Sequence, residues 1–263
     1  MSTKYLGDVF DIHGGGVDLV FPHHENEIAQ AQAVGKSFAR CWVHNGLLTV
    51  SGEKMSKSLG NFIAVEKALE ECHNDTRILK VFFLGSHYRS PIDYSSANLR
   101  AAAGRWNGWY QFLFSAETQR SSAAQLDTLP AELAGLKEEL KRCMDDDLNT
   151  PAALAALDRL ITLGRSWWKE LEAAGGKNQQ AIRMLKARVV CIADVFRELG
   201  EVLGLEWQPM PQLNPEDVEL LDRRETARKR KDFHESDKIR KELEQRGWIV
   251  EDTPLGQRVG PKR

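Results

Sequence analysis

Two lysines lie in a glycine- and serine-rich stretch, residues 51–61, and could act on a phosphate group. They are Lys54 and Lys57, and Ser56 and Ser58 stand beside them in the string Lys-Met-Ser-Lys-Ser. Turns rich in Ser and Gly change conformation at low cost, and lysine ammonium groups are compact charges that suit phosphate. Such a loop can close over a polyphosphate and stabilise negative charge that develops on it. For an arbitrary Lys/Ser loop, a solvated surface loop is the commoner outcome.

A histidine and a glutamate four residues apart form the second candidate site. His23 and Glu27 occur in the string Phe-Pro-His-His-Glu-Asn-Glu, which follows three glycines at 14–16. Pro22 suits the first turn of a helix, where residues i and i+4 share a face. Imidazole and carboxylate at this spacing can bind zinc together. A helix-surface pair is the alternative, but glycines that let the backbone approach a ligand closely favour a site.

Positive charge is concentrated near the C-terminal end, in residues 223–233. Six of these eleven residues are Arg or Lys and two are acidic, whereas the whole chain has a net charge of −2. Cations interleaved with Phe233 and Trp248 suit unstacked RNA, whose phosphates attract cations and whose bases stack on rings. Charge alone leaves two solvated surface helices as an equal alternative.

Hydrophobic periodicity predicts the elements that must position these groups. Strands are predicted over 8–12 and 42–50, and a C-terminal hairpin over 248–259. Helices are predicted over 65–71, 76–84, 99–114, 131–145, 150–169, 179–203, from 215, and 237–246. The fold class is therefore mainly α with a partial α/β segment, and the helices of 131–203 form an up-down bundle. A polar linker at 119–130 and prolines from 209 mark two domain boundaries, after residue 118 and after residue 208.

Composition restricts the cellular context and excludes several classes of protein. With 263 residues, 42% of them hydrophobic, the chain can bury a sizeable core. Its four cysteines are scattered without C-x-x-C spacing, which predicts neither a disulfide framework nor a self-contained cysteine zinc site. No apolar run is long enough for a membrane span, and no signal-peptide pattern begins the chain. We expect a cytoplasmic protein that does not contact a membrane.

Several strings, in order along nearly the whole chain, resemble cysteinyl-tRNA synthetases, which are class I aminoacyl-tRNA synthetases. They are Phe-Asp-Ile-His-Gly-Gly-Gly, Phe-Pro-His-His-Glu-Asn-Glu, Lys-Met-Ser-Lys-Ser, His-Tyr-Arg-Ser-Pro, Asp-Asp-Asp-Leu-Asn-Thr-Pro and Glu-Asp-Thr-Pro. The resemblance implies that 1–62 is the C-terminal part of a Rossmann-type catalytic domain, and that 63–118 connects it to the tRNA-binding parts. It also implies that 119–208 is a helical-bundle tRNA-binding domain and that 209–263 is a small anticodon-recognition module.

The resemblance also assigns roles to individual residues. His23 and Glu27 would bind Zn²⁺, which holds the thiolate of the substrate cysteine and rejects serine, a poor zinc ligand. ATP, bound with Mg²⁺, would react with the cysteine carboxylate, and the lysines would stabilise the departing pyrophosphate. The residues placed on ATP are Lys57, Lys54, Ser56 and Ser58. The residues placed near the anticodon of tRNA(Cys) are Arg228, Phe233, Asp237 and Asp252.

Two parts of the family pattern are missing: the His-Ile-Gly-His half of the ATP site and the two upstream cysteines that complete the zinc site. We therefore expect the C-terminal portion of a synthetase that is inactive alone and holds zinc weakly. The full protein is expected to be a monomer, unless a separate upstream chain completes the catalytic domain. One alternative is the related mycothiol-pathway ligase, which joins cysteine to an amino sugar, although the basic C-terminal module argues against it. Another is a non-catalytic tRNA-binding fragment.

Overall fold

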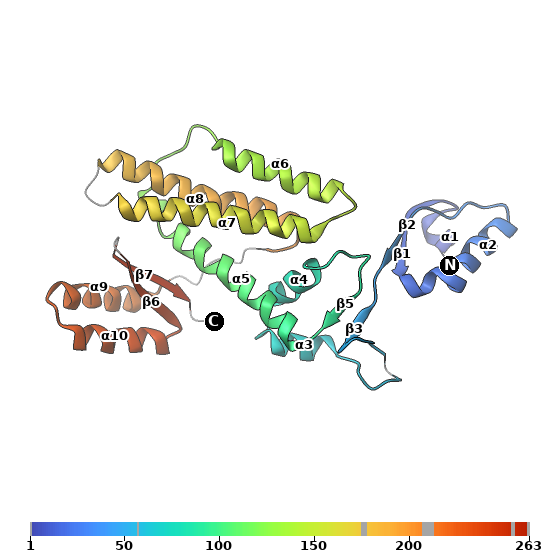
Figure 1. Cartoon of the computed structure of the whole chain (residues 1–263), viewed down its shortest axis with the longest axis horizontal. Coiled ribbons are helices and arrows are strands. Elements are labelled where there is room, and N and C mark those ends of the chain that lie inside the picture. The colour runs from blue at the N-terminus through green and yellow to red at the C-terminus, as the bar shows by residue number, and fades with distance from the viewer. Residues whose placement is uncertain (1, 57, 175–177, 207–212, 254–255, 262–263) are drawn as a thin grey trace. The chain divides into compact units, whose positions relative to one another are not determined.

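The structure is a computed structural model that describes residues 2–56, 58–174, 178–206, 213–253 and 256–261 (Figure 1). Lys57, one of the predicted ATP ligands, lies outside the described residues. The chain divides into two compact units. One unit comprises residues 1–103 and 143–154, and the other comprises residues 104–142 and 155–263.

The first unit begins with a parallel β-α-β arrangement. Strand β1 (Phe10–Gly16) pairs in parallel with β2 (Ala39–Asn45), and helix α2 (Glu25–Ala33) lies between them in sequence. Two neighbouring parallel strands need a crossover connection of this kind, because a tight hairpin turn can join only antiparallel strands. The elements before α2 are α1 (Ser2–Leu6), the 3₁₀ turn η1 (Val17–Leu19) and the π-helical turn η2 (Val20–His24). The predicted strand therefore extends through the three glycines, and α2 begins three residues after Pro22.

A second sheet carries the lysine-rich stretch. Its order is β4 (Glu53–Lys54), β3 (Leu48–Val50) and β5 (Ile92–Tyr94), antiparallel on one side of β3 and parallel on the other. The single strand predicted over 42–50 is wrong, because Gly46 interrupts it. A Cβ at Gly46 would lie 2.2 Å from the carbonyl oxygen of Ser90, so this contact requires glycine. Two helices, α3 (Val65–Glu71) and α4 (Thr76–Leu84), connect β4 to β5.

Long helices dominate the second unit. They are α5 (Ser96–Glu117), which begins in the first unit, α6 (Ala131–Asp145), α7 (Thr150–Ala173) and α8 (Gln179–Val202), with the short turn η3 (Arg120–Ser122). Ion pairs of Lys137 with Glu198 and of Arg159 with Glu139 join α6 to α8 and α7, consistent with the predicted bundle (Figure 1). Apolar side chains at helical spacing are fully buried, as expected for inward-facing stripes. The largest include Trp106, Leu157, Leu160, Leu171, Ile192 and Phe196.

The C-terminal module has its own core within the second unit. It consists of α9 (Pro215–Lys229), α10 (Phe233–Gln245) and the antiparallel hairpin β6 (Trp248–Thr253) and β7 (Gly256–Pro261). The buried cluster contains Leu220, Leu221, Ile239, Leu243, Trp248, Val250, Val259 and Phe114 of α5. In the described part of the chain, no helix combines the length and apolarity needed to cross a membrane.

Candidate active site

Three potential metal ligands converge in the first unit. Ligand atoms of His13, His24 and Glu27 all lie within 4.8 Å of one another. His13 extends from β1, His24 ends η2, and Glu27 lies in the first turn of α2. His13 Nε2 is 3.0 Å from Glu27 Oε2. Two imidazoles and a carboxylate form a donor set that zinc uses in protein sites.

The predicted pair His23 and Glu27 also comes together. His23 Nε2 lies 3.6 Å from Glu27 Oε1, as the i, i+4 spacing predicted, although His23 is exposed. His13 and His24 are the residues that the sequence interpretation did not select. For His13 the available signal was its place directly before the three glycines. For His24 the only available signal was its position directly after His23.

His24 is buried, with 3% of its surface exposed, and this burial determines the protonation state of its ring. Its Nδ1 lies 2.8 Å from His44 Nε2, and its ring is 5.0 Å from the ring of Trp42. A Cβ at Gly15 would lie 2.8 Å from His24 Cε1, so the second glycine of the run makes room for this ring. Burial, followed by the positive charge of a protonated His13, lowers the pKa of His24. At neutral pH the ring is therefore uncharged, and it can offer a nitrogen lone pair to a metal ion.

The carboxylate of Glu27 gives a test of whether the pocket fits a metal. Its Oε2 is buried and accepts no hydrogen bond among the described residues, although His13 Nε2 is close. A buried carboxylate oxygen without a hydrogen-bond donor costs free energy unless a cation or proton is near. A zinc ion would meet that requirement with the N and O donors present. The residues therefore fit the metal.

The lysine loop, residues 51–61, starts from a tight turn between β3 and β4. Ser51 and Gly52 both have positive φ angles, 54° and 81°. Beyond β4 the side chain of Asn61 closes the loop: its Oδ1 accepts from Ser56 N at 2.8 Å, and its Nδ2 donates to the carbonyl of Lys54 at 3.1 Å. The hydroxyls of Ser56 and Ser58 are 3.1 Å apart. The structure therefore brings both predicted serines together.

Lys54 joins this loop to η1, the turn that lies between β1 and the histidine-rich string in the sequence. Its Nζ lies 2.8 Å from Oδ2 of Asp18, in the turn that follows β1. The hydrogen bond from Lys54 is the main cause that lowers the pKa of Asp18. Asp18 lies in η1, between His13 and His23 in the sequence. The two predicted half-sites thus lie on segments that are in direct contact.

The four residues predicted to contact tRNA lie in the C-terminal module. Asp252 accepts two hydrogen bonds from the buried Arg224, at 2.9 and 3.0 Å, and pairs with Arg228 at 3.0 Å. The hydrogen bonds from Arg224 lower the pKa of Asp252. Phe233 is 59% exposed, and Asp237 follows it by four residues on α10. Asp252 therefore has a structural partner that the sequence did not reveal.

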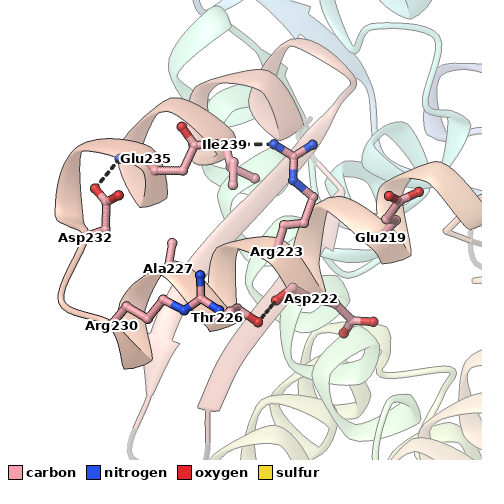
Figure 2. Close-up of a pocket in the computed structure, with 9 residues that line it drawn as sticks. All are labelled: Glu219, Asp222, Arg223, Thr226, Ala227, Arg230, Asp232, Glu235 and Ile239. Carbon is pink, nitrogen blue, oxygen red and sulfur yellow. Dashed lines mark hydrogen bonds and ion pairs between the residues drawn. The ribbon is translucent and has the colours of Figure 1, made fainter.

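A separate hollow of about 350 Å³ lies between α9 and α10 (Figure 2). Its lining consists of Glu219, Asp222, Arg223, Thr226, Ala227, Arg230, Asp232, Glu235 and Ile239. Figure 2 shows Arg223 reaching toward α10, where it pairs with Glu235 at 3.2 Å. Asp232 accepts from the Glu235 amide and caps α10. Arg228, Phe233, Asp237 and Asp252 do not line this hollow.

Three family models match successive parts of the chain. Residues 1–104 match the model described as the tRNA synthetases class I (C) catalytic domain. Residues 139–208 match the DALR domain, and residues 210–259 match the cysteinyl-tRNA ligase anticodon binding domain.

Solved structures support the same fold. A methionyl-tRNA synthetase from Mycobacterium tuberculosis, in complex with methionyl-adenylate, has a TM-score of 0.55 and 20% identity, covering 74% of this chain and 43% of that one. LeuRS from Agrobacterium radiobacter K84 has a TM-score of 0.50 and 18% identity, covering 76% and 28%. Together with the family models, these similarities define a class I aminoacyl-tRNA synthetase fold.

Curated relatives narrow the assignment within that class. Cysteine--tRNA ligases from Trichlorobacter lovleyi and Moorella thermoacetica are 41% and 42% identical, over 97% and 98% of this chain. The chain belongs to the cysteine–tRNA ligase family. It spans about half the length of the curated relatives it matches, 55% of each of these two.

Proposed function

We propose that this chain provides the phosphate-binding lysine loop and part of the cysteine-selecting metal pocket of a cysteine–tRNA ligase. The reaction would join cysteine to ATP as cysteinyl-adenylate and then transfer the cysteinyl group to tRNA(Cys). The observation that supports this proposal best is the contact between Lys54 and Asp18, 2.8 Å long. It brings the loop that would act on phosphate to the segment that links the candidate metal ligands.

The lysines would act on the leaving group of the first step. The carboxylate of cysteine attacks the α-phosphorus of ATP, a P–O bond forms, and the bond to pyrophosphate breaks. Negative charge increases on the departing pyrophosphate, where a flexible lysine ammonium can stabilise it. Lys54 is half-exposed, so its ammonium can exchange Asp18 for phosphate by rotations of its side chain. Lys57 is proposed for the same role on the basis of the motif alone.

The histidine-rich pocket would select the amino acid. His23 and Glu27 would hold zinc, with His13 and His24 beside them as the further donors that the geometry offers. A bound zinc supplies a soft cation that binds a thiolate much better than a hydroxyl. The buried, neutral His24 and the ring of Trp42 exclude water from one side of the pocket. A site of this kind rejects serine because serine lacks the bonding atom.

The C-terminal module would recognise the anticodon. Phe233 exposes a ring on which an unstacked base can stack, and Arg228 places a cation on the neighbouring helix. The match of residues 210–259 to an anticodon binding domain disfavours the amino-sugar ligase, which has no anticodon to read. The proposal includes a cytoplasmic location and a monomeric protein.

Binding of tRNA(Cys) transcripts to this chain, and cysteine-dependent ATP–pyrophosphate exchange by a full-length ligase that contains this segment, test this proposal together. We expect binding to weaken when the anticodon is replaced, and to weaken by about 1–3 kcal/mol in Phe233→Ala, the usual cost of losing one stacked base. Phe83→Ala is the matched control, because Phe83 is a similarly exposed ring in the first unit. Binding that ignores both the anticodon and Phe233 would contradict the tRNA part. Exchange activity that persists without Lys54 would contradict the role of the loop.

A further inference from the structure

Asp93 of β5 holds the base of the lysine loop, although it belongs to neither the lysine motif nor the histidine-rich string. Its Oδ1 accepts from the hydroxyl of Thr49 at 2.9 Å and from the backbone N–H of Gly52 at 2.9 Å. Thr49 lies on β3, and Gly52 lies in the turn between β3 and β4. One carboxylate oxygen therefore connects β5 both to β3 and to the turn from which the loop starts.

The strand register places Asp93 in the same row as Lys54. Thr49 pairs with Lys54 on its antiparallel side and with Asp93 on its parallel side. Residues directly opposite in neighbouring strands present their side chains on the same face of a sheet. The row Asp93–Thr49–Lys54 thus crosses the sheet on one face and ends at the first lysine of the loop.

The turn that Asp93 caps is weakly supported by the backbone. Ser51 and Gly52 are both in the left-handed region, which a non-glycine residue such as Ser51 adopts at a cost. Strand β4 has only two residues, and a short two-stranded hairpin is marginal in water. The carboxylate of Asp93 gives the Gly52 N–H a charge-assisted acceptor that is stronger than a neutral one.

We propose that Asp93 is a positioning residue for the lysine loop: by fixing the turn at Gly52, it fixes the direction in which Lys54 leaves the sheet. The effect of Asp93 on the turn rests only on its two observed hydrogen bonds, from Thr49 and Gly52. Only the purpose of holding Lys54, which is to meet phosphate, rests on the proposed function.

Hydrogen exchange of the purified chain tests this role in three variants. Asp93→Ala removes both acceptor contacts, Asp93→Asn keeps an oxygen that can accept from both donors, and Asp11→Ala removes an exposed carboxylate of the same unit as a control. We expect the Gly52 amide to exchange about tenfold faster in Asp93→Ala, corresponding to about 1.4 kcal/mol. We expect Asp93→Asn to remain within about threefold of the unmodified chain, because a neutral acceptor is somewhat weaker.

The pattern of exchange separates positioning from a general role in folding. Faster exchange confined to the turn and β4, with α3 and α4 unchanged, supports the proposal. An unchanged Gly52 amide, a uniform rise across the unit, or an Asp93→Asn variant as fast as Asp93→Ala would overturn it.

A second measurement separates this inference from the proposed function. Trypsin cleavage after Lys54, identified by mass spectrometry, is expected to be about tenfold faster in Asp93→Ala, because an unrestrained turn exposes the bond. Magnesium pyrophosphate is expected to slow this cleavage in the unmodified chain. If it gives no protection, the phosphate-binding role of the loop fails, while the exchange result still decides the role of Asp93. Equal cleavage in the unmodified chain and Asp93→Ala would overturn the positioning role.

Discussion

The ion pair between Arg224 and Asp252 is expected to hold the C-terminal module together. Arg224 is among the largest fully buried side chains, 1% exposed, and its guanidinium donates to both oxygens of Asp252. It also donates to Gln257 Oε1 at 3.0 Å, so the pair links α9 to both strands of the hairpin. Asp252→Ala would leave the buried guanidinium with only the neutral Gln257 acceptor among these partners.

The expected cost follows from the burial of the two partners. Removing one partner of a fully buried ion pair typically costs about 3–5 kcal/mol, because the other charge stays uncompensated in a low dielectric. The Asp252 side chain is 40% exposed, so water screens part of the interaction and the cost must be reduced. We expect Asp252→Ala to lower the free energy of unfolding of the module by about 2–3 kcal/mol.

Hydrogen exchange of the α10 core amides measures this loss. Ile239 and Leu243 are buried in the module, so their exchange reports its opening. A loss of 2–3 kcal/mol corresponds to exchange that is about 30 to 140 times faster. Arg228→Gln is the control, since Arg228 shares the same carboxylate but is 38% exposed and is expected to cost under about 1 kcal/mol. A change below threefold in Asp252→Ala, or equal effects of the two variants, would refute this reasoning.

Three further predictions concern other parts of the chain. Gly15→Ala is expected to cost about 1–3 kcal/mol by overpacking and to weaken metal binding, because the new Cβ would lie 2.8 Å from the His24 ring; urea denaturation and zinc titration measure the two effects. Asp147, whose pKa is lowered to about 2 mainly by its hydrogen bond from Arg89, contributes stability above the unfolded pKa near 4, and this is lost as pH falls toward 2. The stability difference between the unmodified chain and Asp147→Asn, measured by urea midpoints, should therefore shrink steadily between pH 4 and 2, and a difference that is undiminished at pH 2 would contradict this assignment. Gly135→Ala is expected to stabilise the chain by about 1 kcal/mol, since a Cβ in this helix meets no atom within 4 Å, and a lower melting temperature would contradict it.

Local patterns predicted the helices well where neighbouring residues determine the ends. The predicted bounds 65–71, 76–84 and 131–145 agree with α3, α4 and α6, and the side chain of Asp75 caps α4 by accepting from the Arg77 amide. The predicted start of α10 was too late. Asp232 caps α10, which begins at Phe233, four residues before the predicted start at Asp237.

Contacts between distant segments limited the prediction of the site. The pair His23 and Glu27 was predictable because the two residues are one helical turn apart. His13 joins them only because η1, η2 and α2 fold back beside β1, and periodicity does not specify that return. The contact of Lys54 with Asp18 spans 36 residues. Such a contact depends on how the turn after β1 lies against the end of β4, for which the sequence carries no local signal.

The capacity of the histidine-rich pocket to select a thiol is the central claim, and cobalt substitution tests it most directly. Co²⁺ occupies zinc sites, and a bound thiolate adds a strong ligand-to-metal charge-transfer band to its spectrum. Titrating the chain with enough Co²⁺ to saturate its weak site, and then with cysteine, should produce this band, whereas serine should not, and Glu27→Gln should abolish it. An equally strong band in Glu27→Gln, or no spectral difference between cysteine and serine, would contradict the account.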